Sequence, residues 1–109
     1  MTEETLLKAN TDTVANSLYV IYFHVDDGKY GYYSQKCKYF RPDEGEATPK
    51  PILTFNIKSL MKKVSLFGTF EEAEHMCGWL KEKRHITYAC SKPLNEVLRY
   101  VDDMNKHRQ

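Results

Sequence analysis

An Asp-Gly pair between two strand-like stretches constrains this chain more than any other feature. Residues 18–25 (LYVIYFHV) and residues 29–40 (KYGYYSQKCKYF) are rich in aromatic and β-branched residues, and Asp27-Gly28 lies between them. Such a pair favours a two-residue type I′ turn, in which both residues take positive φ. The sequence therefore predicts an antiparallel hairpin with its turn at Asp27 and Gly28.

A two-residue turn at this point also fixes which residues lie opposite each other. Phe23 is expected opposite Tyr32 on one face of the hairpin, and Tyr22 opposite Tyr33 on the other face. The first face also carries Ile21, so we expect it to form core. The second face has polar neighbours, and it suits either a covering helix or a partner surface.

The stretch after the hairpin has weaker signals. Residues 41–51 contain three prolines, a glycine and three acidic residues, which predicts an irregular loop. Residues 52–57 (ILTFNI) are typical of a strand, whereas residues 58–66 fit either a helical turn or a strand. We therefore expect a third strand after the loop and leave the next segment open.

The last part of the chain predicts helix, strand and helix. Thr69 and Glu72 form a capping box at the start of an amphipathic helix. Residues 85–90 (HITYAC) are typical of a strand. Ser91 with Pro93 is expected to open the final helix, with the serine as its N-cap.

This order of elements predicts an α+β fold. We expect the β-hairpin and two further strands in an antiparallel or mixed sheet, with two amphipathic helices packed on one face. A chain of 109 residues suits a single domain, which we place at residues 17–109. The polar residues 1–16 are expected to form a loosely ordered N-terminal arm.

Composition excludes several classes of protein. The chain has 16 Lys+Arg and 15 Asp+Glu, so its near-neutral charge gives no general attraction to nucleic acid or anionic lipid. We find neither a long apolar run nor an apolar leader at the acidic start, which argues against a membrane span or a secretory signal. Three cysteines without a CxxC motif favour a reducing compartment, so we expect a cytoplasmic protein.

The sequence lacks the common catalytic and phosphate-binding motifs. The cysteines and histidines do not have the spacing of metal ligands, and the thiols are expected to be buried and free. We therefore expect no enzyme activity, no metal ion and no small-molecule cofactor. A small nuclease or toxin centred on His24 is one alternative, but it would need concentrated positive charge to hold the nucleic acid.

The aromatic residues gather in the hairpin. Eight of the 14 aromatic residues fall between residues 19 and 40, and the basic residues of this region outnumber its acidic ones. Tyrosine and tryptophan supply rigid contact area with a polar tip, as protein interfaces use them. We therefore expect a binding module that acts through protein–protein contact, as do the inhibitors and adaptors of phages and mobile elements. The expected contact residues are Tyr22, Tyr33, Lys36, Lys38 and Trp79.

The main alternative is a single-stranded nucleic-acid-binding protein that uses the same hairpin. Bases stack on aromatic rings that are exposed on a sheet, at about 1–3 kcal/mol per base, and lysines contact the phosphates. The residues that would do so are Tyr22, Tyr33, Lys29, Lys36, Lys38 and Arg41.

Overall fold

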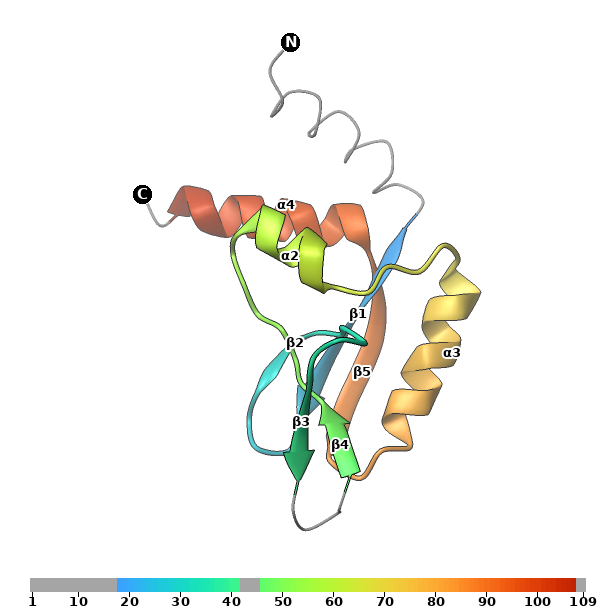
Figure 1. The fold of residues 1–109 in the computed structure, drawn as a ribbon. Helices are drawn as coiled ribbons and strands as arrows, with labels where there is room; N and C mark the ends of the chain where they lie inside the picture. The colour runs from blue at the N-terminus through green and yellow to red at the C-terminus, as the bar shows by residue number, and fades with distance from the viewer. Residues whose placement is uncertain (1–17, 42–45, 108–109) are drawn as a thin grey trace.

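The computed structural model describes residues 18–41 and 46–107, and the expected arm at residues 1–16 lies outside the described residues (Figure 1). The described elements, in chain order, are β1 (Tyr19–Val25), β2 (Tyr30–Tyr32), β3 (Lys38–Arg41), β4 (Glu46–Pro49), α2 (Ile57–Lys63), α3 (Phe70–Lys81), β5 (Ile86–Pro93) and α4 (Leu94–His107). They confirm the α+β class.

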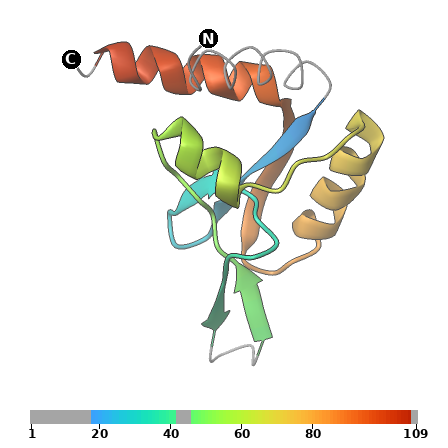
Figure 2. The same ribbon diagram turned by 45° about the horizontal axis from the view of Figure 1, so that its top comes forward.

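The central sheet has three antiparallel strands in the order β2-β1-β5. Strand β1 lies in the middle, where Phe23 faces Gly31 of β2 on one side and Ala89 of β5 on the other. Strand β1 is thus paired along its length with β5, which is far from it in the sequence. In Figures 1 and 2, α3 lies beside β5, and α4 runs across the top of the sheet above α2.

The predicted hairpin is present, but its loop has three residues instead of two. The Gly28 amide donates to the Val25 carbonyl at 3.1 Å, and the Val25 amide donates to the Lys29 carbonyl at 2.9 Å. Gly28 has a φ of 89°, whereas no residue other than glycine has a positive φ among the described residues. This is the pattern of a three-residue loop that ends in a left-handed glycine. The predicted type I′ turn, which needs positive φ at Asp27 as well, is wrong.

The extra loop residue shifts the pairing of the hairpin by one. Tyr22 lies opposite Tyr32, and Phe23 lies opposite Gly31. A slip of one residue moves every side chain of the second strand to the other face of the sheet. Tyr32 therefore shares a face with Tyr22, and Tyr33 is buried in the cluster that contains Phe23. The expected pairs were wrong for this reason.

Gly31 is the point where the second strand approaches the following segment most closely. A Cβ atom at this position would lie 2.4 Å from the Ile52 carbonyl oxygen. The Tyr32 amide donates to the Ile52 carbonyl at 2.8 Å, and the Ile52 amide donates to the Tyr32 carbonyl at 3.0 Å. Residues 52–57 pair with the sheet through this single bridge and form no strand, so the predicted third strand is wrong.

Strands β3 and β4 form a separate two-stranded sheet at the lower end of the molecule in Figure 1. The expected strand over residues 29–40 is interrupted by a turn, in which the Cys37 amide donates to the Ser34 carbonyl at 3.2 Å. The expected loop at residues 41–51 contains β4, which ends at Pro49. Proline is tolerated at the edge of a sheet because it need not donate to a neighbouring strand.

Helices cover both faces of the central sheet. One buried cluster joins α3 to Ile21 and Phe23, and the other joins α2 and α4 to Val20 and Tyr32. The two amphipathic helices therefore lie on opposite faces, not together on one face as expected. The reason is that β1 is apolar on both sides, with Val20 and Ile21 both fully buried, and such a strand needs cover on both faces.

Helix α3 begins where the sequence predicts, whereas α4 begins later than predicted. The Thr69 hydroxyl accepts from the Glu72 amide at 3.1 Å, which confirms the predicted N-cap of α3. Strand β5, however, includes Ser91, and α4 begins at Leu94. Ser91 is therefore not a helix cap, and its hydroxyl donates to the Glu74 carboxylate at 2.5 Å.

Candidate functional site

Aromatic side chains cover the face of the central sheet that lies on the side of α4. Residues two apart on a strand point to the same face, so neighbouring strands place their rings side by side. Strands β1, β2 and β5 supply five of these side chains, and α4 supplies the sixth. We call this surface the tyrosine face, and its members are Tyr22, His24, Tyr30, Tyr32, Tyr88 and Tyr100.

The rings of the tyrosine face pack against one another. The ring centres of Tyr22 and Tyr32 are 5.6 Å apart at an angle of 59°, and those of His24 and Tyr88 are 5.3 Å apart at 68°. His24 Nε2 and the Tyr22 hydroxyl form a hydrogen bond of 3.0 Å. Aromatic pairs in such geometries contribute about 0.5–1.5 kcal/mol beyond their buried area. The face is therefore a preformed layer of rings.

The outer rings of this layer remain open to solvent. Tyr30, Tyr88 and Tyr100 are 46%, 50% and 51% exposed, whereas Tyr32 is 5% exposed. Tyr32 is thus buried within the layer, and the rings of Tyr30, Tyr88 and Tyr100 leave about half of their surface accessible to a partner.

A hollow of about 300 Å³ lies between the sheet and α4. Half of its lining residues are tyrosines, which include Tyr22, Tyr30 and Tyr100. Its charged residues are Lys92, whose Nζ lies 6.0 Å from the centre of the Tyr22 ring, and Glu96. One cation and one anion leave the hollow without net charge, so its chemistry suits neutral groups with both apolar and polar parts.

Burial raises the pKa of Tyr32 to about 12, with a smaller contribution from Tyr100. Burial also raises the pKa of Tyr22. At Tyr88 a side-chain hydrogen bond with Cys90 raises the pKa. These hydroxyls are therefore neutral at physiological pH, and each can donate and accept a hydrogen bond.

The structure does not bring the five expected contact residues onto one surface. Tyr22 belongs to the tyrosine face, but Tyr33 is 6% exposed on the other side of the sheet. Lys36 lies in the turn after β2, and Lys38 lies on β3, both exposed. Trp79 is 40% exposed on α3. Of the five, Tyr22 alone lies on the tyrosine face. The expected role of the other four in binding stays a prediction, and it is a different contact from one made through the tyrosine face.

The residues expected for nucleic-acid binding are also dispersed. Lys29 is exposed in the hairpin loop, where its Nζ lies 4.0 Å from the Asp27 carboxylate. Arg41 belongs to β3, and its side chain lies outside the described residues. Among the residues that line the 300 Å³ hollow, Lys92 is the single base. None of the expected lysines therefore lines the hollow of the tyrosine face.

Three exposed residues of the tyrosine face were not among the expected contact residues. The predicted register, which is shifted by one, places Tyr30 on the same face as Phe23, the face expected to form core. Tyr88 lies opposite His24 only because β5 pairs with β1, and this long-range pairing has no local signal in the sequence. Tyr100 lies off the apolar stripe of its helix, which was a usable signal for an exposed contact residue.

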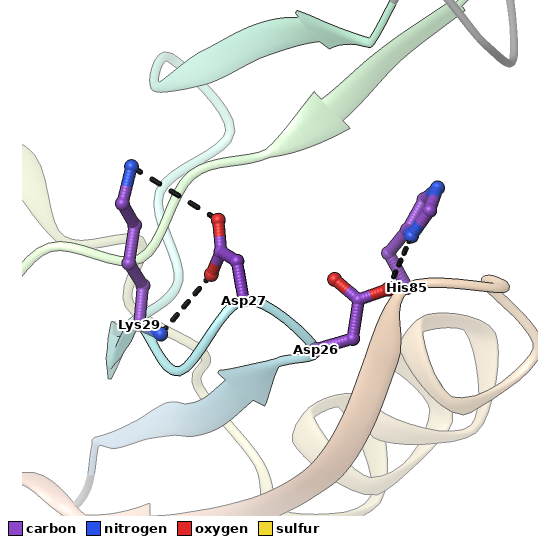
Figure 3. A network of polar contacts seen from close by, with 4 residues as sticks. All are labelled: Asp26, Asp27, Lys29 and His85. Atoms are coloured by element: carbon purple, nitrogen blue, oxygen red, sulfur yellow. Dashed lines mark hydrogen bonds and ion pairs between the residues drawn. The ribbon is translucent and has the colours of Figure 1, made fainter.

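A second polar cluster joins the hairpin loop to the start of β5 (Figure 3). His85 Nδ1 lies 2.6 Å from the Asp26 carboxylate, and the Asp26 amide donates to the His85 carbonyl at 2.9 Å. Beside them, the Lys29 amide donates to the Asp27 carboxylate at 3.1 Å. The His85 side chain is 9% exposed and the Asp26 side chain is 42% exposed, so the pair connects the hairpin loop to β5 with its imidazole largely covered. His24, on which the alternative of a small nuclease or toxin is centred, lies in the ring layer and not in this cluster.

Comparison of the chain with models of protein families, with curated proteins and with solved structures found no match. Within residues 18–41 and 46–107, no group of three or more His, Cys, Asp or Glu residues could hold a metal ion. None of the helices in that part of the chain is long and apolar enough to cross a membrane.

Proposed function

We propose that this protein is a small non-enzymatic binding module that acts through protein–protein contact, with the tyrosine face as its contact surface. The observation that carries the proposal is the group of half-exposed rings, Tyr30, Tyr88 and Tyr100, on a preformed aromatic layer. Tyrosine gives a large contact area at low entropic cost, because only two side-chain torsions must be fixed. A cytoplasmic role as an inhibitor or adaptor, of the kind that phages and mobile elements encode, is part of this proposal.

The position of α4 supports this proposal. The Asn105 side-chain amide donates to the Phe55 carbonyl at 2.9 Å, and the Leu94 amide donates to the Leu18 carbonyl at 2.9 Å. These bonds hold the helix near both of its ends, and Val97 and Val101 bury its apolar side. Because the helix is fixed, Tyr100 is held beside the sheet before any partner binds. Such preorganisation reduces the cost of binding.

Charge favours a protein partner over nucleic acid. Binding to nucleic acid depends strongly on neutralised phosphates, and the hollow in the tyrosine face combines Lys92 with Glu96. The neutral hydroxyls of the rings instead suit hydrogen bonds to the main chain or to polar side chains of a protein. Single-stranded nucleic acid is therefore the alternative ligand, which the nuclease treatment described below distinguishes from a protein.

Affinity capture from a lysate of the organism that encodes this chain tests the proposal, with and without nuclease treatment. We expect the wild-type protein to retain a protein partner in both conditions. The double variant Tyr88→Ser/Tyr100→Ser should lose this partner, since both rings are half exposed and lie outside the two buried clusters of the core. The control variant Trp79→Ala changes an exposed ring on α3, and it should keep the partner.

Three results would contradict the proposal. Capture that is unchanged in the double variant would remove the tyrosine face as the contact surface. Loss of the partner in Trp79→Ala would move the contact to α3. Material that is retained only without nuclease would identify a nucleic-acid-binding protein.

A further inference from the structure

Three lysines surround a second hollow, which lies between the turn after β2, the end of α2 and α3. The hollow has a volume of about 360 Å³. Its rim carries Lys36, Lys62 and Lys63, and its apolar lining comes from side chains that include Tyr33, Phe67 and Met76. We call it the lysine notch, defined by these six residues.

Specific hydrogen bonds build the lysine notch. The Ser65 amide donates to the Tyr33 carbonyl at 2.9 Å, and the Gln35 amide donates to the Ser65 hydroxyl at 2.9 Å. These bonds hold the turn after β2 against the segment that follows α2. As a result, Lys36 is kept beside Lys62 and Lys63, although these residues are far apart in the sequence.

The three charges of the rim are of one sign and are exposed. In residues 18–41 and 46–107, none of the three lysines forms an ion pair. Lys62 and Lys63 lie in the last turn of α2, where positive charge favours the helix end. Lys36 has no such role and adds repulsion to the group. An anion in the notch would relieve this repulsion.

The surroundings of the notch favour carboxylates over phosphates or bases. Clustered free backbone amides commonly cradle a phosphate. Here the amides of Gln35, Lys36 and Cys37 all donate to oxygens of the protein itself. Tyr33 is 6% exposed and Phe67 is half-buried, so neither ring offers a fully open face on which a base could stack. Flexible lysines around an apolar floor instead suit carboxylates that flank an apolar side chain.

We propose that the lysine notch binds an acidic peptide segment of a protein partner. Carboxylates of the segment pair with the lysines of the rim, and one apolar side chain rests on the floor. The proposal depends on charge complementarity at this hollow and not on the tyrosine face, which lies on the other side of the sheet. Either surface can therefore fail its test without the other.

Fluorescence anisotropy with a labelled synthetic peptide of glutamates around one leucine tests this proposal. We expect binding that weakens as salt rises from about 0.05 to about 0.5 M. Lys36→Glu/Lys63→Glu should weaken binding by roughly tenfold or more, since two attractions become repulsions. Lys81→Glu/Lys106→Glu changes the net charge equally on α3 and α4, and it should bind almost as the wild type does. Tyr88→Ser/Tyr100→Ser should also retain the peptide.

A milder variant keeps the test independent of folding. Lys36→Gln should weaken binding while its thermal midpoint stays equal to or above that of the wild type. Equal losses in the notch and control variants, or no loss in the notch variant, would overturn the proposal. So would tighter binding of a thymidine oligonucleotide, or full competition by inorganic phosphate at concentrations similar to those of the peptide.

Discussion

Gly31 is a position of the central sheet where even a methyl group has no room. A methyl group there would lie 2.4 Å from the Ile52 carbonyl oxygen, so Gly31→Ala must separate the two segments. We expect a loss of about 2–3 kcal/mol in the free energy of unfolding, because the Tyr32–Ile52 hydrogen bonds are strained or broken. Urea denaturation measures this loss.

Gly78 provides the matched control for this substitution. It lies in α3, and a Cβ atom there would meet nothing within 4 Å. Gly78→Ala should stabilise the protein by up to about 1 kcal/mol, since alanine is the better helix former. A Gly31→Ala variant as stable as the wild type would show that the segment at Ile52 does not pack against β2 as described.

Tyr32 makes stability depend on alkaline pH. Its pKa is raised to about 12 in the folded protein from an ordinary value of 10.0. A raised pKa means that the folded state holds the proton more tightly, so the contribution is complete below pH 10 and is lost as the pH rises toward 12. Cys77, whose burial raises its pKa to about 11 from 9.0, acts in the same direction.

Denaturation at a series of pH values above 9 measures this dependence. The wild type should lose about 2–3 kcal/mol through Tyr32 between pH 10 and pH 12. Tyr32→Phe should lose less over the same interval and keep only the part that comes from Cys77 and other groups. Equal slopes for the two proteins would contradict the burial of the Tyr32 hydroxyl.

At the scale of elements, the loop of the first hairpin shows what local patterns do not encode. The strands on both sides of Asp27-Gly28 were predicted, but the register was not. Asp26 forms hydrogen bonds to His85 with both its amide and its carboxylate. It therefore contacts the start of β5 and becomes part of the loop. A distant residue thus sets the length of the loop, and the loop sets the face on which Tyr32 and Tyr33 lie.

Other elements also were predicted where local sequence determines them and were missed where distant pairing does. The start of α3 was predicted because its cap, Thr69 with Glu72, is local. Residues 52–57 have strand-like composition but find no neighbouring strand beyond the bridge at Ile52. Strand β4 was missed because residues 41–51 have the composition of a loop, and pairing with β3 overrides it.

The contact between Asp26 and His85 is testable as a coupling between elements. A double-mutant cycle with Asp26→Ala and His85→Ala should give a coupling energy of about 1–2 kcal/mol, because the short hydrogen bond joins the hairpin loop to β5. Thermal or urea denaturation of the four proteins provides the values. Strictly additive losses would show that the two side chains do not hold these elements together.

For the whole molecule, β1 separates two surfaces of different chemistry. Side chains that alternate along this strand point to the ring layer on one side and to the cluster under α3 on the other. Sequence reasoning located the aromatic concentration and named Tyr22. It did not place Tyr88 or Tyr100 beside Tyr22, since these reach the same face only through the pairing of β5 and the docking of α4. Lys36, expected beside the rings, lies at the lysine notch instead.

The most direct test of the tyrosine face is photo-crosslinking in a lysate of the organism that encodes this chain. A photoreactive phenylalanine analogue in place of Tyr88 should crosslink to a protein, and nuclease should leave the product unchanged. The same analogue in place of Trp79 should give little of that product, because α3 covers the other face of the sheet. Crosslinks to nucleic acid alone, or the same protein crosslinked equally from both positions, would contradict a protein contact through the tyrosine face.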